Sequence, residues 1–278
     1  MKRVLHFLQA MKAVMIRDIL TFIRYKSWFV SIVIWPIVFP FTFLFLGKGL
    51  AGPSNEGVYN FAKLTGTTDF GSFIILGNLV WMFLNILMWD AGLSLNNLRR
   101  LGMLDTIWTF PAPKLSYIFG STISSLILNF IPMIFSFIFF RIIKVLQFNA
   151  KPIDIFIYSL SILPFIIGFL LIFASLSLRS KEASLVVQAM RVLLSILCGL
   201  QLPLNVLPEF LQKIGIIIPI THYINCLRDS IILGVKLSDK LPSIYYMILS
   251  GFFILFTGII TFALVEKNAK SKGLISGY

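Results

Sequence analysis

Long runs of uncharged, apolar residues dominate the chain, and short polar segments separate them. The runs are rich in Phe, Ile and Leu and lack the two-residue alternation of barrel strands, which favours α-helices. A hydrocarbon layer about 30 Å thick needs about 20 apolar residues per helix, and six runs approach or exceed that length. The sequence therefore predicts an all-α polytopic membrane protein. Its six predicted transmembrane helices cover residues 28–46, 71–89, 116–140, 155–178, 192–207 and 243–265.

The segment before these runs has a different pattern. Its apolar residues recur at three- and four-residue spacing, with basic residues between them; they are Val4, Leu8, Met11, Met15, Ile19 and Phe22. This periodicity predicts an amphipathic helix in the membrane interface, serving either as an anchor or also as a contact for a partner subunit. The preceding basic residues and the length of the first run argue against a cleaved signal peptide. We expect one transmembrane domain over residues 1–278, with an interface helix (1–27), a six-helix membrane domain (28–265) and a cytoplasmic tail (266–278).

Prolines interrupt the apolar sequence after the fifth run. Residues 210–218 are apolar but too few to cross a membrane, and prolines flank them. This pattern is typical of re-entrant or interfacial helices, whose backbone survives at membrane depth only inside protein or along a cavity. We therefore expect re-entrant helices between the fifth and sixth spans, at the external mouth of the domain.

Lysine and arginine outnumber the acidic residues by 24 to 11, which gives a net charge of +13. In a membrane protein the distribution of these residues reports orientation more than their total does. With both termini in the cytoplasm, fourteen of them lie inside and nine outside, and Arg191 lies close to the inner end of the fifth run. This bias predicts a multi-pass cell-membrane protein with cytoplasmic ends. Anionic membrane lipid accounts for the basic inner face, so the charge requires no nucleic-acid partner.

Motifs for intrinsic catalysis are absent from the 278 residues. There is no GxxxxGK[ST], HExxH or GxSxG motif, and His6 and His222 are the only histidines. Cys198 and Cys226 are too few for a disulfide framework or a cysteine-rich metal site. The acidic residues are scattered, which argues against an enzyme and against the charge ring of an ion channel. We therefore expect no catalytic residue, metal or cofactor in this chain, and an outside energy source for any transport.

Four polar residues within or beside the predicted spans are candidates for a transport pathway. Asn78 and Asn85 are seven residues apart on one face of the second span, and Gln188 and Arg191 lie at the inner part of the fifth segment. Asparagines in membranes commonly form hydrogen bonds between helices, and an arginine can extend its charge to the interface. The alternative is that these side chains line a pathway, with Arg191 as an inner gate charge.

Residues 96–114, NNLRRLGMLDTIWTFPAPK, form the polar stretch between the second and third runs. Within it, LRRLGMLDTIW predicts one short amphipathic helix that ends at FPAPK. We expect one apolar side, formed by Leu98, Leu101, Leu104 and Ile107 or Trp108, and three exposed charges, Arg99, Arg100 and Asp105. The element is either a solvated loop or a rigid knob that docks a cytosolic subunit.

This stretch resembles the first cytoplasmic segment of ABC-2 type permeases, in which R-x-x-G-T-L-E-x-L precedes a proline pair and a helix with a glycine. The matching residues are Gly102, Leu104, Asp105, Pro111 and Gly120, with Met103 in place of Thr and Asp105 in place of Glu. Asn96 and Asn97 stand where the family has an acidic residue. A second stretch, LPLNVLPEFLQKIGIIIPITHYINCLRDSIILG, is similar to the segment before the family's sixth span. Its residues in register are Pro203, Leu207, Pro208, Leu211, Ile214, Pro219 and Arg228.

The resemblance implies a homodimer, or a pair of similar permeases, in which each copy binds a separate cytosolic ABC ATPase subunit that holds ATP and Mg²⁺. The residues implied to dock on the ATPase, as a coupling helix, are Arg99, Arg100, Leu101, Gly102, Met103, Leu104, Asp105 and Ile107. Those implied to form an external re-entrant gate are Pro203, Leu207, Pro208, Leu211, Pro219 and Arg228. The dimer interface would form the export route, lined mainly by the second and fifth spans.

The first span and the segment before it look closer to drug-exporter and nodulation-type members than to polysaccharide exporters. We therefore expect export of a hydrophobic or amphipathic solute, such as a drug, an antibiotic or a lipid, from the cytoplasm or the inner leaflet. Lipid-linked polysaccharide or glycolipid is the alternative cargo, and a cation or a peptide is a further alternative. A non-transporting membrane scaffold or anchor is the alternative from another class of function.

Overall fold

The computed structural model describes residues 2–50, 56–180 and 182–271. The described residues form twelve α-helices and two short 3-10 helices, with no strand, which confirms the predicted all-α class. In chain order these elements are α1 (Lys2–Arg24), α2 (Lys26–Leu50), α3 (Glu56–Thr65), α4 (Phe70–Asp90), α5 (Ser94–Arg100), α6 (Leu104–Thr109), α7 (Lys114–Ile142), α8 (Pro152–Arg179), α9 (Ala183–Leu197), η1 (Leu204–Val206), α10 (Glu209–Ile217), α11 (Pro219–Leu233), η2 (Leu237–Lys240) and α12 (Leu241–Ser271).

Four helical segments in the described ranges are long and apolar enough to cross a membrane: α4, α7, α8 and residues Leu237–Ala269, which include α12. Helices α10 and α11 form a pair bent by 90°, which raises the count to five if the pair is taken as one span. The apolar part of α2 covers Val33–Gly49, and α9 has 15 residues, so both are shorter. The chain is therefore a multi-pass membrane protein, while the predicted count of six spans is not confirmed and the re-entrant helices stay a prediction.

The fifth predicted span, residues 192–207, does not form one helix. Instead α9 begins at Ala183 and ends at Leu197, and the chain then turns through Gly199, whose φ of +65° is left-handed. Glycine adopts a left-handed backbone conformation at little cost in free energy, whereas other residues do not. In the segment that follows, Pro203 and Pro208 would interrupt a helix, because proline has no backbone N–H. Hydropathy alone predicted this span too far toward the C-terminus, because residues 198–207 are largely apolar although they do not continue α9.

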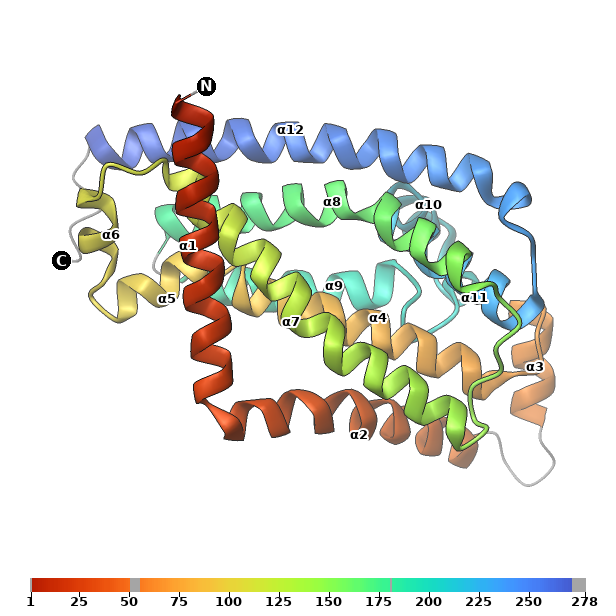
Figure 1. The fold of residues 1–278 in the computed structure, drawn as a ribbon. Coiled ribbons are helices and arrows are strands. Elements are labelled where there is room, and N and C mark those ends of the chain that lie inside the picture. Colours follow the sequence, from red (N-terminus) through yellow and green to blue (C-terminus); the bar gives the residue numbers. More distant parts are fainter. Residues whose placement is uncertain (1, 51–55, 181, 272–278) are drawn as a thin grey trace.

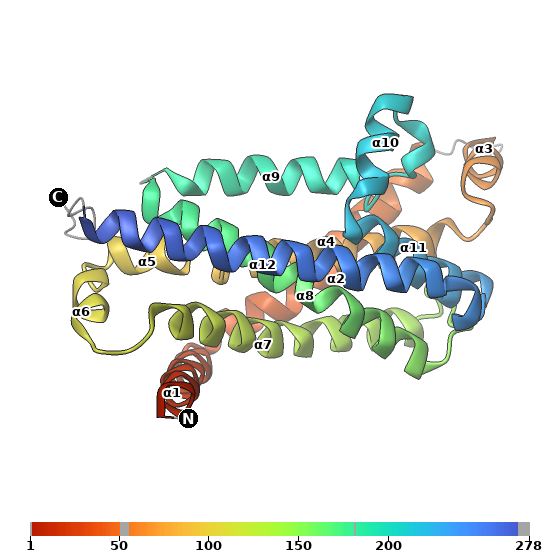
Figure 2. The same ribbon diagram turned by 90° about the horizontal axis from the view of Figure 1, so that it is seen from above.

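The helices form an elongated bundle in which α4 is the central element (Figures 1 and 2). Helix α4 is buried along most of its length, and Ile75, Leu87 and Met88 are almost completely covered. In Figure 1, α12 and α2 run along opposite sides of the bundle, with α4, α8 and α9 between them. The short helices α5 and α6 lie at one end, and α3, α10 and α11 lie at the other.

The N-terminal helix α1 lies transverse to the bundle helices in Figure 1 and is amphipathic, as predicted. It rests on α7, where Gly120 lets the two backbones approach. A Cβ on Gly120 would lie only 2.8 Å from the carbonyl oxygen of Met11 and 2.9 Å from Cβ of Val14. The glycine therefore marks the point where α1 crosses α7.

Helices α8 and α12 pack together through glycines. A Cβ added to Gly168 would overlap the backbone of Leu255, and one added to Gly258 would overlap the carbonyl oxygen of Gly168. Small residues of this kind let membrane helices approach closely, where van der Waals packing, rather than the hydrophobic effect, holds them together. This contact fixes α12 on the bundle, while its opposite side remains open.

We predict that Gly168→Val destabilises the permease, because the larger side chain must push α12 away from α8. Overpacking of this kind costs about 1–3 kcal/mol of the free energy of unfolding. Thermal unfolding of the purified protein in detergent measures the change. The control is Gly49→Val in α2, where an added Cβ meets no atom within 4 Å. Equal losses in the two variants would contradict the α8–α12 contact.

Candidate functional site

The stretch predicted as one amphipathic helix forms two helices, α5 and α6, separated by a sharp turn. Gly102 has a φ of +68°, and its N–H donates to the carbonyl of Arg99 at 3.0 Å. The next N–H, of Met103, donates to the carbonyl of Leu98 at 2.9 Å. This is the hydrogen-bond pattern by which a glycine ends a helix, and it explains why the predicted continuous helix was wrong.

The turn changes which side chains are exposed. Leu98 and Leu104 are buried as predicted, but Leu101 is 71% exposed and Met103 is 46% exposed, so they do not share the buried side. Ile107 is half-buried and packs against the core formed around α7, α8 and α12, and the side chain of Asp105 lies outside the described residues. The exposed segment of Arg100, Leu101, Gly102 and Met103 is called the tip below.

Arg99 was predicted to be exposed, and this was wrong. Its guanidinium donates to the carbonyl oxygens of Ser177 at 3.1 Å and Leu178 at 2.6 Å, at the carboxyl end of α8. The last carbonyls of a helix have no partner within the helix and carry partial negative charge, so a cation stabilises them. Arg99 therefore attaches the α5 side of the tip to a long helix of the bundle.

A second basic side chain holds the α6 side of the tip. Lys114, at the start of α7, is buried, and its Nζ donates to the carbonyls of Ile107 at 3.0 Å and Phe110 at 2.6 Å. The residues between α6 and α7 include Pro111 and Pro113, which cannot donate backbone hydrogen bonds. The tip is thus connected at one side to α8 and at the other to α7.

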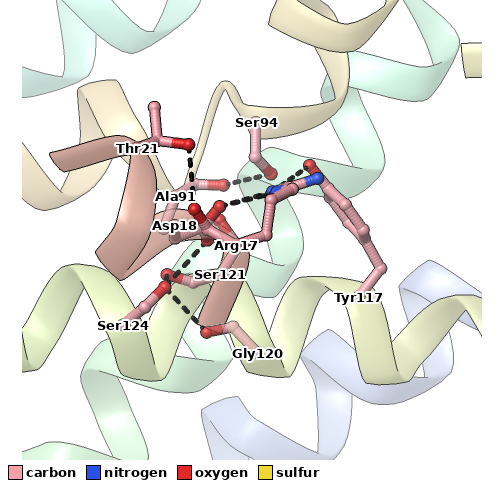
Figure 3. A network of polar contacts seen from close by, with 9 residues as sticks. All are labelled: Arg17, Asp18, Thr21, Ala91, Ser94, Tyr117, Gly120, Ser121 and Ser124. Carbon is pink, nitrogen blue, oxygen red and sulfur yellow. Dashed lines mark hydrogen bonds and ion pairs between the residues drawn. The ribbon is translucent and has the colours of Figure 1, made fainter. Parts of the chain in front are cut away.

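A polar network joins α1 to α7 near the tip (Figure 3). Asp18 accepts from the Nε of Arg17 at 2.9 Å and from the hydroxyl of Ser124 at 2.8 Å. The Nη2 of Arg17 donates to the Tyr117 hydroxyl at 3.0 Å. The Cζ of the same guanidinium lies over the Tyr117 ring, 4.9 Å from its centroid. The two charges of α1 therefore satisfy each other and also bind two side chains of α7.

The environment of Arg17 favours its charged form. Burial lowers the pKa of the guanidinium, but Tyr117 and Asp18 outweigh this effect, and the pKa lies above its ordinary value. Beside the network lies a cavity of about 390 Å³ between α1, α4, α5 and α7, whose lining includes Leu101 and Met103 of the tip. The network is therefore next to the tip as well as between two helices.

Sequence reasoning did not identify this network, although a signal was present. Tyr117, Ser121 and Ser124 recur at spacings of four and three, which places them on one side of α7. The partner, Asp18, is adjacent to Arg17 on the amphipathic helix. Nothing in the local pattern specifies that these two segments meet, because they are about 100 residues apart in sequence.

Of the four pathway candidates, the structure brings Asn85 and Arg191 together. They line a groove of about 460 Å³ between α2, α4 and α9, and its other lining residues include Trp35, Trp81 and Trp89. We call this the tryptophan groove. Asn78 is fully buried elsewhere, where its Nδ2 donates to the carbonyl of Ile74 at 2.9 Å. Gln188 is exposed on α9 but does not line the groove.

Arg228, predicted as part of a gate, is a buried side chain that fixes a helix end. It donates to the carbonyls of Gly199 at 2.7 Å and Leu200 at 2.8 Å, directly after α9. Its guanidinium also lies 3.4 Å from the centroid of the Phe73 ring in α4. A Cβ on Gly77 would overlap the carbonyl of Leu200, so α4 approaches this turn closely. Arg228 therefore links the turn after α9 to α11 and α4.

The other gate candidates take different positions at the same end of the bundle. Pro203 is buried and lines a cavity of about 300 Å³ with Arg228. Pro219 is buried as the first residue of α11, whereas Leu207, Pro208 and Leu211 lie at or in α10 and outside this cavity. Among the described residues, no cluster of three or more His, Cys, Asp or Glu side chains could hold a metal ion.

We predict that Asp18→Ala loosens α1 from the bundle, because Arg17 and Ser124 lose their shared acceptor. Hydrogen bonds to a charged group contribute about 1.5–3 kcal/mol, so local opening of α1 should become easier by about that amount. Hydrogen–deuterium exchange measures this opening as faster exchange confined to α1. In the control, Glu182→Ala, the exposed carboxylate forms no cap hydrogen bond. Unchanged protection of α1 in Asp18→Ala would contradict the anchoring role.

Comparison with known proteins identifies the family of the chain. No curated protein matches the sequence. The family model described as ABC-2 family transporter protein matches residues 50–260, a range that contains α4 to α11, the tip and Arg228. The match covers more than half of the chain, and members of this family are membrane subunits of ABC transporters that are not themselves catalytic. The chain therefore belongs to the ABC-2 family of transporter proteins.

Proposed function

We propose that this protein is the permease subunit of an ATP-driven exporter and that its tip docks on a separate cytosolic ATPase subunit. The single observation that supports docking is the exposure of Leu101 and Met103 beside the cationic Arg100. A hydrophobic and basic ridge on a solvent-facing turn suits a groove on the partner that has an apolar floor and an acidic rim. ATP and Mg²⁺ then belong to that partner, and both termini of the permease lie on the same cytoplasmic side.

The attachments of the tip provide a route for movement. Arg99 connects it to α8 and Lys114 connects it to α7, and α7 in turn holds α1 through Asp18. Rigid-body motion of docked subunits is a common way to transmit a conformational change. When two ATPase subunits close on ATP, they would draw two tips together, and α7, α8 and α1 would move with them. The bent pair α10–α11 would close the external side of the pathway.

Two copies of the permease would meet along α9. The open side of this helix is apolar, but it also presents the exposed amide of Gln188. A polar side chain is costly in lipid, whereas a protein interface or a water-filled pathway can satisfy it. Its exposed apolar residues are Leu185, Val186, Val192, Leu193 and Ile196. Between Leu241 and Leu264 the exposed residues of α12 are apolar or aromatic, which suits lipid instead.

The cargo is a hydrophobic or amphipathic solute, as in drug-exporter and nodulation-type members of the family. The support is the position of the tryptophan groove, which lies between α4 and α9 and thus beside the proposed dimer interface. Three indole rings offer large apolar contact area, with a few polar groups for orientation, as in many small-molecule sites.

We predict that Leu101→Asp uncouples the permease from its ATPase. Leu101 is 71% exposed, so the substitution leaves the core intact, whereas Leu104 is buried and its replacement would damage the fold. A carboxylate in an apolar docking groove should weaken the complex about tenfold or more. Co-purification with the ATPase, followed by solute-stimulated hydrolysis in liposomes, measures the effect.

The matched control is Ile142→Asp at the far end of α7, where the side chain is 72% exposed. This variant should bind the ATPase normally, because Ile142 lies at the opposite end of α7 from Lys114. Normal coupling by Leu101→Asp and Met103→Asp, each correctly inserted, would show that the tip is not the docking element.

We also predict that Val192→Cys forms a covalent dimer across α9 on mild oxidation in membranes, because two copies of this face would be adjacent. The native Cys198 and Cys226 are buried and should react little. Phe252→Cys on α12 is the control, since 57% of Phe252 and 58% of Val192 are exposed. Gel electrophoresis without reductant resolves the products. Cross-linking through Phe252→Cys but not Val192→Cys would place the dimer interface elsewhere.

A further inference from the structure

The tryptophan groove contains hydrogen-bond donors without acceptors. Among the described residues, none accepts a hydrogen bond from the Arg191 guanidinium or forms an ion pair with it. The indole Nε1 of Trp81 is buried and likewise has no acceptor, and no described group hydrogen-bonds the Asn85 amide, whose Oδ1 is buried. Two donor groups, the Arg191 guanidinium and the Trp81 indole, and one acceptor, the Asn85 Oδ1, therefore belong to residues that line one groove, and none of them has a described partner.

An arginine without a described hydrogen-bond acceptor on a largely apolar helix requires a physical explanation. The guanidinium lies 5.4 Å from the centroid of the Trp89 ring, a cation–π contact that uses none of its N–H donors. Charged groups in membrane segments are costly and usually pair with one another or with a ligand. The planar guanidinium can bind two oxygens of a phosphate or a carboxylate at once. An oxyanion in the groove would therefore satisfy the guanidinium.

The rest of the groove suits an apolar body. Trp35 and Trp89 are both exposed, and the Trp81 ring stacks on Phe39 with 4.9 Å between ring centroids. The volume of about 460 Å³ lies within the range of small-ligand sites, about 300–1,000 Å³. A ligand with an anionic group at Arg191 and an apolar body against the indole rings would satisfy both parts of the groove.

One acidic residue also lines the groove and opposes an anion. Asp90 ends α4, and its Oδ2 lies 3.4 Å from the Nδ2 of Asn129, which belongs to α7 on another side of α4. The amide of Asn129 therefore engages one oxygen of Asp90. The remaining repulsion between Asp90 and an anionic ligand offers a second, independent test of the sign of the ligand charge.

We propose that the tryptophan groove binds an amphiphile through its oxyanionic group, with Arg191 as the anion-binding residue and Trp35, Trp81 and Trp89 as the surface for its apolar body. The binding site follows from the groove alone, while its role as the cargo site rests on the proposed function. The ligand class is a phosphate or carboxylate attached to an aromatic or aliphatic body, and inorganic phosphate is the alternative source of the same chemistry.

Isothermal titration calorimetry of the purified permease in non-ionic detergent tests this proposal. The probe is 1-naphthyl phosphate, with 1-naphthol as the neutral analogue and inorganic phosphate as the competitor. We expect 1-naphthyl phosphate to bind at least about tenfold more tightly than 1-naphthol, and R191Q to remove about a tenfold factor or more. Equal affinities for the two naphthyl compounds, or an unchanged affinity in R191Q, would overturn the anion site. If inorganic phosphate at equal concentration displaces 1-naphthyl phosphate, the proposal that the ligand is an amphiphile would be overturned.

The matched control is R141Q. Arg141 also lies over an aromatic ring, 4.6 Å from the centroid of Phe148, but it is exposed at the far end of α7. Its replacement should change the affinity less than about twofold. If R191Q does not fold, D90N decides the question: removing the carboxylate should tighten binding of 1-naphthyl phosphate, and weaker binding would indicate a cationic ligand and overturn the proposal.

The assay contains no ATPase, so it separates the two proposals. If binding depends on Arg191 but 1-naphthyl phosphate is not transported in liposomes on addition of ATP, the groove would stand as a binding site and its role in export would be rejected. If 1-naphthyl phosphate is transported but its binding does not depend on Arg191, the proposed exporter function would stand and the proposed binding site in the groove would be rejected.

Discussion

Backbone carbonyls without partners are the constraint on which this structure depends. A helix end that is packed inside a protein cannot leave its carbonyls without partners, so each interrupted helix must find donors for the groups released at its end. Here basic side chains supply them at three places. Arg99 binds the end of α8, Lys114 binds the end of α6, and Arg228 binds the residues after α9. Each donor comes from another element, so that satisfying a helix end also fixes the position of two elements.

These attachments explain why the working parts can lie on irregular structure. The tip is a glycine turn of four residues, too short to hold its own shape, and Arg99 and Lys114 tie both of its sides to long helices. Arg228 does the same for the turn that ends α9, and so positions the helix that carries Arg191. In the proposed exporter, both the docking element and the cargo groove are therefore placed by the bundle rather than by local sequence.

The sequence predicts the helical class and most of the long helices, because apolar length and composition are local properties. It also identifies the polar stretch before α7 and Gly102, but not that the left-handed Gly102 ends α5 and leaves Leu101 exposed at its C-terminus. That Asn85 and Arg191 line one groove, while Asn78 lies apart from both, depends on how α4 and α9 pack. The family resemblance implies a docking role for Arg99 and a gate role for Arg228, and these roles stay predictions, while the contacts place both side chains at helix ends.

The hydrogen bond between Asp18 and Ser124 joins residues 106 positions apart. During synthesis, α1 leaves the ribosome well before α7 exists, so it has no docking partner while the first two apolar segments insert. The helix must therefore remain at the lipid surface by its own amphipathic character until α7 is in place. Final placement of α1 is consequently a late event in biogenesis, although the segment is made before α7.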